Sequence, residues 1–97
     1  MSRHEHDVRL HRIAEKDLAD IVDYIAAERP AAAASTLARI EQSLALLRKS
    51  PYLGKLPDDK RLIELGYRCL IVDDYLVFYT VDDRTVLVHR LMRGARD

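Results

Sequence analysis

The residues that could do chemistry gather in the second half of the chain, where basic side chains accompany one histidine. They are Arg68, His89, Arg90, Arg93 and Arg96. In an antiparallel sheet we expect Arg68 and Arg90 to share one face and His89 to show the other, because successive strand residues alternate. The arginines could stabilise a phosphorane while His89 or a tyrosine moves protons, which would be metal-free RNA cleavage through the substrate's 2′-OH. The same residues also fit a solvated arginine face with His89 packed under a helix.

Other chemical motifs are weak. His4 and His6 could chelate one ion from an extended segment, but no third and fourth ligands follow at a fixed spacing, so no metal site is expected. Cys69 has apolar neighbours and is expected to be a small buried side chain rather than a nucleophile. The sequence contains no glycine-rich phosphate loop and neither the His-Glu-x-x-His nor the Gly-x-Ser-x-Gly motif. Classical hydrolase, kinase and dehydrogenase chemistry is therefore disfavoured, and no cofactor is expected.

Length and composition limit the class of protein to which the chain can belong. The 97 residues carry 16 Lys and Arg against 16 Asp and Glu and are 48% hydrophobic, as in a single folded domain. We expect a polar tail over residues 1–7 and one domain over residues 8–97. No apolar run approaches the roughly 20 residues of a membrane span, and the polar start is unlike a signal peptide. A lone cysteine needs no oxidising compartment, so a cytoplasmic location without membrane contact is expected.

Apolar spacing predicts the elements that must position the basic residues. Helical spacing covers residues 14–28 and 30–49, and Pro30 between them predicts an antiparallel helix hairpin. Residues 51–64 carry the glycine, proline and aspartate of a loop. The expected strands cover residues 8–13, 65–72, 75–81 and 85–91. The order β-α-α-β-β-β predicts an α+β fold, in which the helix hairpin packs on a small twisted, mostly antiparallel sheet.

Characteristic segments follow one another along nearly the whole chain from Val8. They are Asp17-Leu18-x-x-Ile21-x-x-Tyr24-Ile25, Pro30 with its alanine run, Ser50-Pro51-x-x-Gly54, Leu65-Gly66-Tyr67-Arg68-x-Leu70, Tyr75-Leu76-Val77-Phe78-Tyr79 and Val88-His89-Arg90-Leu91-Met92-Arg93-Gly94-Ala95-Arg96-Asp97. In this order the chain resembles the RelE/ParE toxin superfamily of bacterial type II toxin–antitoxin systems. The resemblance implies the same fold and a toxin held inactive, in a hetero-oligomer, by a cognate antitoxin whose disordered segment wraps its helices and sheet.

The resemblance implies two alternative mechanisms. RelE-like toxins are endoribonucleases that cleave mRNA on the ribosome, whereas ParE-like toxins poison DNA gyrase and are not enzymes of their own. This sequence has Leu70 and Leu76 where the ribonuclease branch carries basic residues, and a leucine cannot stabilise phosphoryl charge. It also has no tyrosine near its end. We therefore favour a ParE-like gyrase inhibitor, while His89 keeps RNA cleavage open and a non-toxic interaction module is the third reading.

The two mechanisms give overlapping candidate sites. For the ParE-like mechanism, the residues expected to contact the target are Arg68, His89, Arg90, Arg93 and Arg96. For RNA cleavage, the candidate catalytic residues are Arg68, His89 and Arg90. The apolar stripes of the helices are expected to supply the core and the antitoxin-binding surface.

Overall fold

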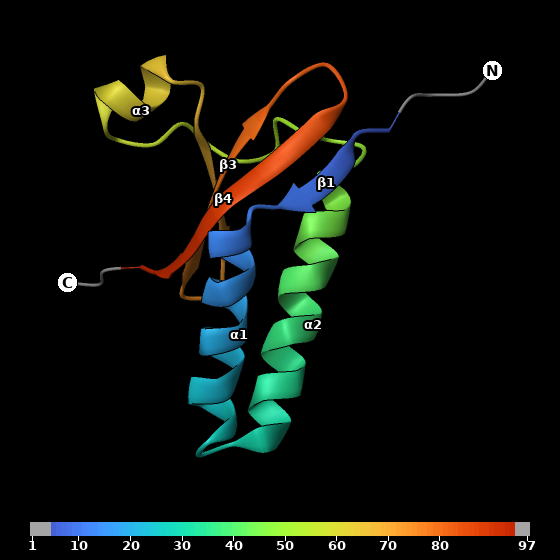
Figure 1. Ribbon diagram of the computed structural model, residues 1–97, viewed down its shortest axis with the longest axis vertical. Coiled ribbons are helices and arrows are strands. Elements are labelled where there is room, and N and C mark those ends of the chain that lie inside the picture. The colour runs from blue at the N-terminus through green and yellow to red at the C-terminus, as the bar shows by residue number, and fades with distance from the viewer. Residues whose placement is uncertain (1–4, 95–97) are drawn as a thin grey trace.

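A helix pair packs on one side of a four-stranded sheet in the computed structural model, which describes residues 5–94 (Figure 1). The strands are β1 (Asp7–Leu10), β2 (Arg68–Val72), β3 (Tyr75–Val81) and β4 (Thr85–Arg93), and the helices are α1 (Arg12–Ala26), α2 (Pro30–Leu46) and α3 (Lys60–Glu64). The strand order is β1-β4-β3-β2; β1 runs parallel to β4, and the other neighbours are antiparallel. The predicted α+β fold is confirmed, with α3 as an additional short helix.

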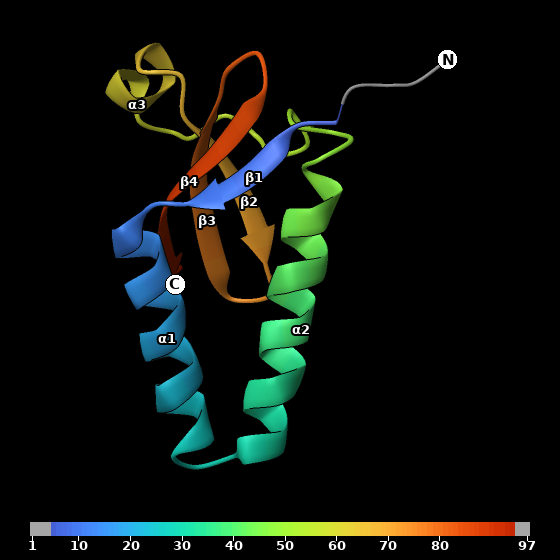
Figure 2. The same cartoon turned by 45° about the vertical axis from the view of Figure 1, so that its right-hand side comes forward.

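The two long helices lie side by side as the predicted antiparallel hairpin (Figures 1 and 2). Pro30 stands in the first turn of α2, where the missing N–H of proline costs no helical hydrogen bond. α1 begins at Arg12, earlier than predicted, because Nδ1 of His11 accepts the N–H of Ile13 at 3.1 Å and caps the helix. The first strand is shorter than predicted for the same reason. Within residues 5–94, no helix has the length and apolar character needed to cross a bilayer.

A short helix interrupts residues 51–64, which were predicted to be a loop. The Asp59 carboxylate caps α3 by accepting two N–H groups of its first turn, at 2.8 and 3.3 Å. Gly66 then adopts a φ of +87°, a conformation that residues with a side chain rarely reach. β2 therefore begins at Arg68, and the predicted strand start at residue 65 is wrong.

The strand register separates the two faces of the sheet. Leu70, Val77 and Leu91 lie opposite one another in a single row across β2, β3 and β4. This row belongs to the core, on the face that the helix pair covers, which we call the helix face. Side chains alternate along a strand, so the rows on either side point to the opposite face, which we call the open face. These rows are Ile71 with Leu76 and Met92, and Cys69 with Phe78 and Arg90.

The core between the helices and the helix face is apolar. Val77 is fully buried and Leu91 is 2% exposed. From α2 and its C-terminal cap, Ile40, Leu44 and Leu47 pack against them. Burying one such side chain contributes about 1.5–3 kcal/mol, so this layer holds the helices to the sheet.

Candidate functional site

Arg68, at the start of β2, fastens the loop that follows α2 to the sheet. Its Nη1 atom donates to the carbonyl oxygens of Gly54 and Tyr52 at 2.7 and 3.3 Å, and its guanidinium carbon lies 5.0 Å from the centre of the Tyr52 ring. Beside it, the buried hydroxyl of Tyr79 accepts the N–H of Gly54 at 2.8 Å. A Cβ atom at residue 54 would lie 2.7 Å from that hydroxyl oxygen, so the close approach requires glycine. The Arg68 guanidinium is therefore engaged in holding this loop.

His89 lies at a β-bulge in β4. The register between β3 and β4 shifts after Phe78, which leaves His89 as an extra residue of its strand. Its Nε2 lies 2.9 Å from Oγ1 of Thr80, and its Nδ1 lies 3.3 Å from the hydroxyl of Tyr67. Partial burial lowers the pKa of His89, and the nearby His11 lowers it further. The imidazole is therefore neutral near pH 7, with a hydrogen-bond partner at each nitrogen.

Arg90 is held by a residue of α1. Its Nε and Nη2 atoms donate to the two carboxylate oxygens of Asp17 at 2.8 and 3.1 Å, and the N–H of Leu91 donates to the same carboxylate at 3.0 Å. The hydrogen bond from Arg90 is the main reason that the pKa of Asp17 is lowered, and the same bond raises the pKa of Arg90. β1 ends at Leu10, short of this part of β4, so Asp17 takes the place of a strand neighbour there.

The sequence analysis missed this role of Asp17, which it named only as part of a segment that resembles the toxin superfamily. Asp17 and Arg90 are 73 residues apart, and no local spacing links them. The one available signal was Arg90 itself, since a charged side chain within an apolar strand needs a partner where it is partly desolvated. That signal does not say which of the many acidic residues the partner is.

The structure brings together only part of the predicted set. His89 and Arg90 both lie on the open face, because the bulge interrupts the alternation of β4. Arg68 pairs with Tyr79 and so lies on the helix face. The expectation that Arg68 and Arg90 share a face, with His89 on the other, is therefore wrong. His89 packs against the ring of Tyr67, at 4.8 Å between centroids, and not under one of the long helices.

Arg93 is separate from both of these places. It pairs with Tyr75 near the end of β4 and lines a cleft between the helix pair and the β2–β3 turn. In that cleft Arg39 forms an ion pair with Asp73 at 2.6 Å. Arg96 lies outside the described residues. Within residues 5–94, the predicted arginines thus occupy three places and form no single basic patch.

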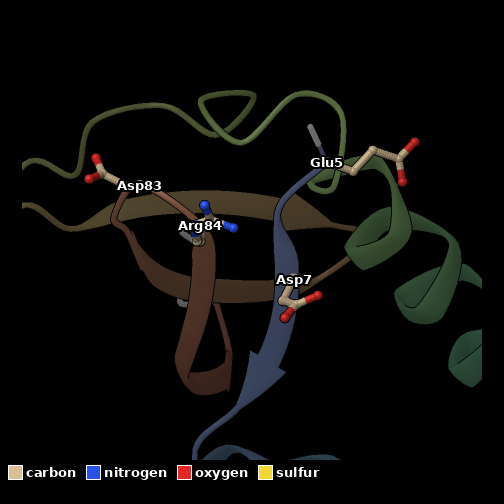
Figure 3. A pocket seen from close by; sticks show the side chains of 4 residues that line it. All are labelled: Glu5, Asp7, Asp83 and Arg84. Carbon is tan, nitrogen blue, oxygen red and sulfur yellow. The ribbon is translucent and has the colours of Figure 1, made fainter. Parts of the chain in front are cut away.

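Carboxylates gather near the start of β1 without converging. A shallow pocket there is lined by Glu5, Asp7, Asp83 and Arg84 (Figure 3). Glu5 and Asp7 extend to one side of β1, and Asp83 lies across from them and points away. In the part of the chain that the structure describes, no three His, Cys, Asp or Glu side chains lie close enough to hold a metal ion. The ring of His6 contacts the carbonyl oxygen of Asp82 at 3.0 Å, and His4 lies outside the described residues.

Cys69 is a packing residue, as its neighbours predicted. It is 5% exposed, in the open-face row beside Phe78. Burial raises the pKa of its thiol, which disfavours the nucleophilic thiolate.

Comparison with known proteins identifies the family. The sequence model of the ParE toxin of the type II toxin–antitoxin system parDE matches residues 8–97. The chain belongs to this toxin family. No curated protein sequence matches it.

Two solved structures share the fold of the toxin. A chain of the chromosomal ParDE TA system from P. aeruginosa is 18% identical and has a TM-score of 0.78, over 96% of this chain and 100% of that chain. A chain of the toxin–antitoxin complex RelBE2 from Mycobacterium tuberculosis is 23% identical and has a TM-score of 0.65, over 98% of each chain. The predicted membership of the RelE/ParE superfamily, on the ParE side, is confirmed.

Proposed function

We propose that this ParE-family toxin arrests growth by poisoning DNA gyrase through binding alone, without catalysing a reaction. The observation that supports this best is the dispersal of the candidate catalytic groups. Arg68 holds a loop on the helix face, Arg90 is paired with Asp17, and His89 has partners at both nitrogens. Phosphoryl transfer needs charged donors about 3 Å from one reacting phosphate, whereas an inhibitory surface needs no such convergence.

Two leucines also favour contact over catalysis. Leu70 packs against the core on the helix face, and Leu76 lies on the open face between Ile71 and Met92. These are the positions where basic residues would serve RNA cleavage. Apolar side chains there cannot stabilise phosphoryl charge, whereas Leu76, on the open face, can contribute to a protein interface.

One observation favours ribosome-dependent mRNA cleavage as a second candidate. His89 and Arg90 share the open face, and the pKa of His89 is lowered by burial, so its imidazole is neutral near pH 7. A neutral imidazole can accept a proton from a 2′-OH, and a neighbouring guanidinium can stabilise negative charge. RNA cleavage would thus use His89 and Arg90 as catalytic groups, whereas gyrase inhibition by binding requires no catalytic group.

We infer that an antitoxin encoded beside the toxin neutralises it in the cytoplasm by binding a groove between β1 and the helix pair. The groove is lined by Val8, Leu10, Leu18, Leu44 and Ala45, with Glu41 and Arg48 as its charged residues. An apolar groove with charged margins suits a segment that folds as it binds. The toxin–antitoxin hetero-oligomer would then leave the open face of the sheet uncovered by this contact.

The test is induced expression without the antitoxin, with DNA breaks, plasmid supercoiling and mRNA integrity measured in the same cells. Purified toxin is then added to a gyrase supercoiling reaction and, separately, to translating ribosomes. We expect gyrase-linked DNA breaks with intact mRNA, and loss of supercoiling activity in the purified reaction. Codon-phased mRNA cuts with normal DNA would overturn the gyrase proposal.

His89→Gln separates binding from proton transfer in both assays. Glutamine keeps a polar side chain between Thr80 and Tyr67 but exchanges no proton near neutral pH. Inhibition by contact should change by less than about tenfold, whereas loss of a general acid or base costs about 100-fold or more. A loss of that size in growth arrest, with unchanged folding, would favour the ribonuclease.

A further inference from the structure

The open face of the sheet carries an apolar strip that crosses three strands. Ile71, Leu76 and Met92 lie opposite one another in one row, and Phe78 lies in the next row. Ile71 is 51% exposed and Met92 is 44% exposed. Isolated exposed apolar residues need no explanation, but a contiguous exposed row typically marks an interaction surface.

Arg90 borders this strip and has N–H donors that its pairing with Asp17 does not use. It lies across from Phe78, and its side chain is 48% exposed. Asp17 accepts hydrogen bonds from Nε and Nη2, which leaves both N–H groups of Nη1 and one of Nη2 unused by that pair. Because the bidentate pair fixes the plane of the guanidinium, these donors are held in position before any partner arrives.

The composition of the strip is that of an interface centre. Aromatic residues, methionine and arginine are enriched in the cores of protein interfaces, and arginine and aromatic residues dominate their binding energy. The two rows contain no acidic side chain of their own, as the register shows. A complementary partner therefore has apolar side chains for the strip and a carboxylate or carbonyl oxygen for Arg90.

We propose that this strip (Ile71, Leu76, Phe78 and Met92, bordered by Arg90) is the surface by which the toxin docks on its protein target. The occupant is a folded protein surface with an apolar centre and an acidic group at its margin. The inference rests on the proposed function, because it takes the target to be a protein, and it goes beyond that function by naming the contact surface.

The shape and charge of the strip favour this occupant over two others. A row across a sheet is open and suits a folded surface, whereas the groove between β1 and the helices suits a folding antitoxin segment. A second copy that packed its strip against this one would bring another Arg90, and the carboxylate beside that arginine, Asp17, is already engaged. Charge complementarity therefore selects a partner other than the toxin itself.

The experiment compares Ile71→Glu and Met92→Glu with a matched control, Leu46→Glu. Leu46, near the end of α2, is 57% exposed and is not part of the strip or the groove. Each variant is assayed for thermal unfolding, growth arrest, gyrase inhibition, binding to the antitoxin encoded beside it, and mass in solution. Met92→Leu, which keeps an apolar side chain, tests whether a loss follows from the charge.

We expect the two strip variants to lose at least tenfold in growth arrest and in gyrase inhibition, with folding and antitoxin binding retained. Leu46→Glu should act like the unaltered toxin, and Met92→Leu should lose less activity than Met92→Glu, because it keeps an apolar side chain in the strip. Undiminished growth arrest by both strip variants would overturn the proposal. So would a selective loss of antitoxin binding, or conversion of a dimeric toxin to a monomer, since each would assign the strip to another occupant.

The same experiment distinguishes the two proposals. If the unaltered toxin poisons gyrase and the strip variants do so equally well, the docking surface is wrong and the function stands. If the unaltered toxin arrests growth without affecting gyrase, and the strip variants lose that arrest without mRNA cleavage, the function is wrong and the strip binds another protein. A toxin that cleaves mRNA, or has no effect on growth, overturns both.

Discussion

The two faces of the sheet are both apolar, yet they differ in their exposure to solvent. On the helix face, the row of Leu70, Val77 and Leu91 packs in or against the core that α1 and α2 cover. One residue further along each strand, Ile71 and Met92 on the open face are about half exposed. Hydrophobic residues alone therefore do not identify the core, because the decisive factor is which face the helices cover.

The polar contacts of the two faces differ in the same way. On the helix face, Arg68 and the Tyr79 hydroxyl hold the loop at Gly54, so their hydrogen bonds serve the fold. On the open face, Arg90 keeps unused donors beside exposed apolar residues. The helix face is consequently where substitutions should unfold the toxin, and the open face is where they should change its contacts.

The largest expected effect comes from two adjacent residues of β4 that point to opposite faces. Leu91→Ala should reduce the free energy of unfolding by about 2–5 kcal/mol, because it leaves a cavity in the core. Met92→Ala removes a half-exposed side chain and should cost less than about 1 kcal/mol. Urea unfolding followed by circular dichroism measures both values.

Equal losses of unfolding free energy for Leu91→Ala and Met92→Ala would contradict the proposed difference between the two faces. They would mean that the open face is packed against something in the folded protein and is not a free surface. A small loss at both positions would instead mean that the helices do not depend on this part of the sheet.

A smaller effect is expected at Asp17, which ties α1 to the edge of β4. Asp17→Ala leaves the N–H of Leu91 and two donors of Arg90 without their acceptor, and a partly buried donor left unpaired costs about 1–3 kcal/mol. Asp17→Asn should cost less, because its amide oxygen can still accept one hydrogen bond. Thermal and urea unfolding of both variants give the two losses.

The effect at Asp17 also depends on pH in a defined direction. The pKa of Asp17 is lowered from its ordinary 3.8, so the carboxylate stabilises the fold fully above that value. The stability difference between the unaltered toxin and Asp17→Asn should therefore shrink as the pH falls through and below 3.8. A difference that stays constant down to about pH 2 would show that the charge of Asp17 contributes nothing, since it would then be independent of protonation.

The elements were predictable from sequence because their signals are local. Leu18, Ile21 and Ile25 repeat at helical spacing, and Pro30 marks the joint between the helices. α3 was not predicted, because five residues are too few to show the helical period of apolar residues. Its one signal in the sequence is Asp59, which caps its first turn. The family followed from segments whose order is readable along the chain.

The arrangement of the candidate site was not predictable, because it depends on contacts between distant residues. The bulge at His89 has no signal in the sequence of its strand, yet it places His89 on the same face as Arg90. The pairing of Asp17 with Arg90 joins residues from opposite ends of the chain. The opposite faces of Arg68 and Arg90 follow from the pairing of the strands, because Arg90 lies opposite Phe78, and Phe78 lies opposite Cys69, the neighbour of Arg68.

The smallest expected effect is acid sensitivity of the open face through His89. Burial holds the pKa of this imidazole below its ordinary 6.5, so the folded toxin resists a proton that the unfolded chain accepts. The free energy of unfolding should thus decrease as the pH falls from about 7 to about 5, because the unfolded chain binds more protons in this range.

His89→Gln isolates this effect, because it removes the titrating group and keeps a polar side chain beside Thr80. The variant should show a flatter dependence of unfolding free energy on pH, and NMR titration of the unaltered toxin should place the His89 midpoint below 6.5. A midpoint above that value would mean that the folded protein prefers the charged ring. Since a charged imidazole donates from both nitrogens, the hydroxyls of Thr80 and Tyr67 would then both be acceptors, and His89 would join Arg90 as a second cation on the open face.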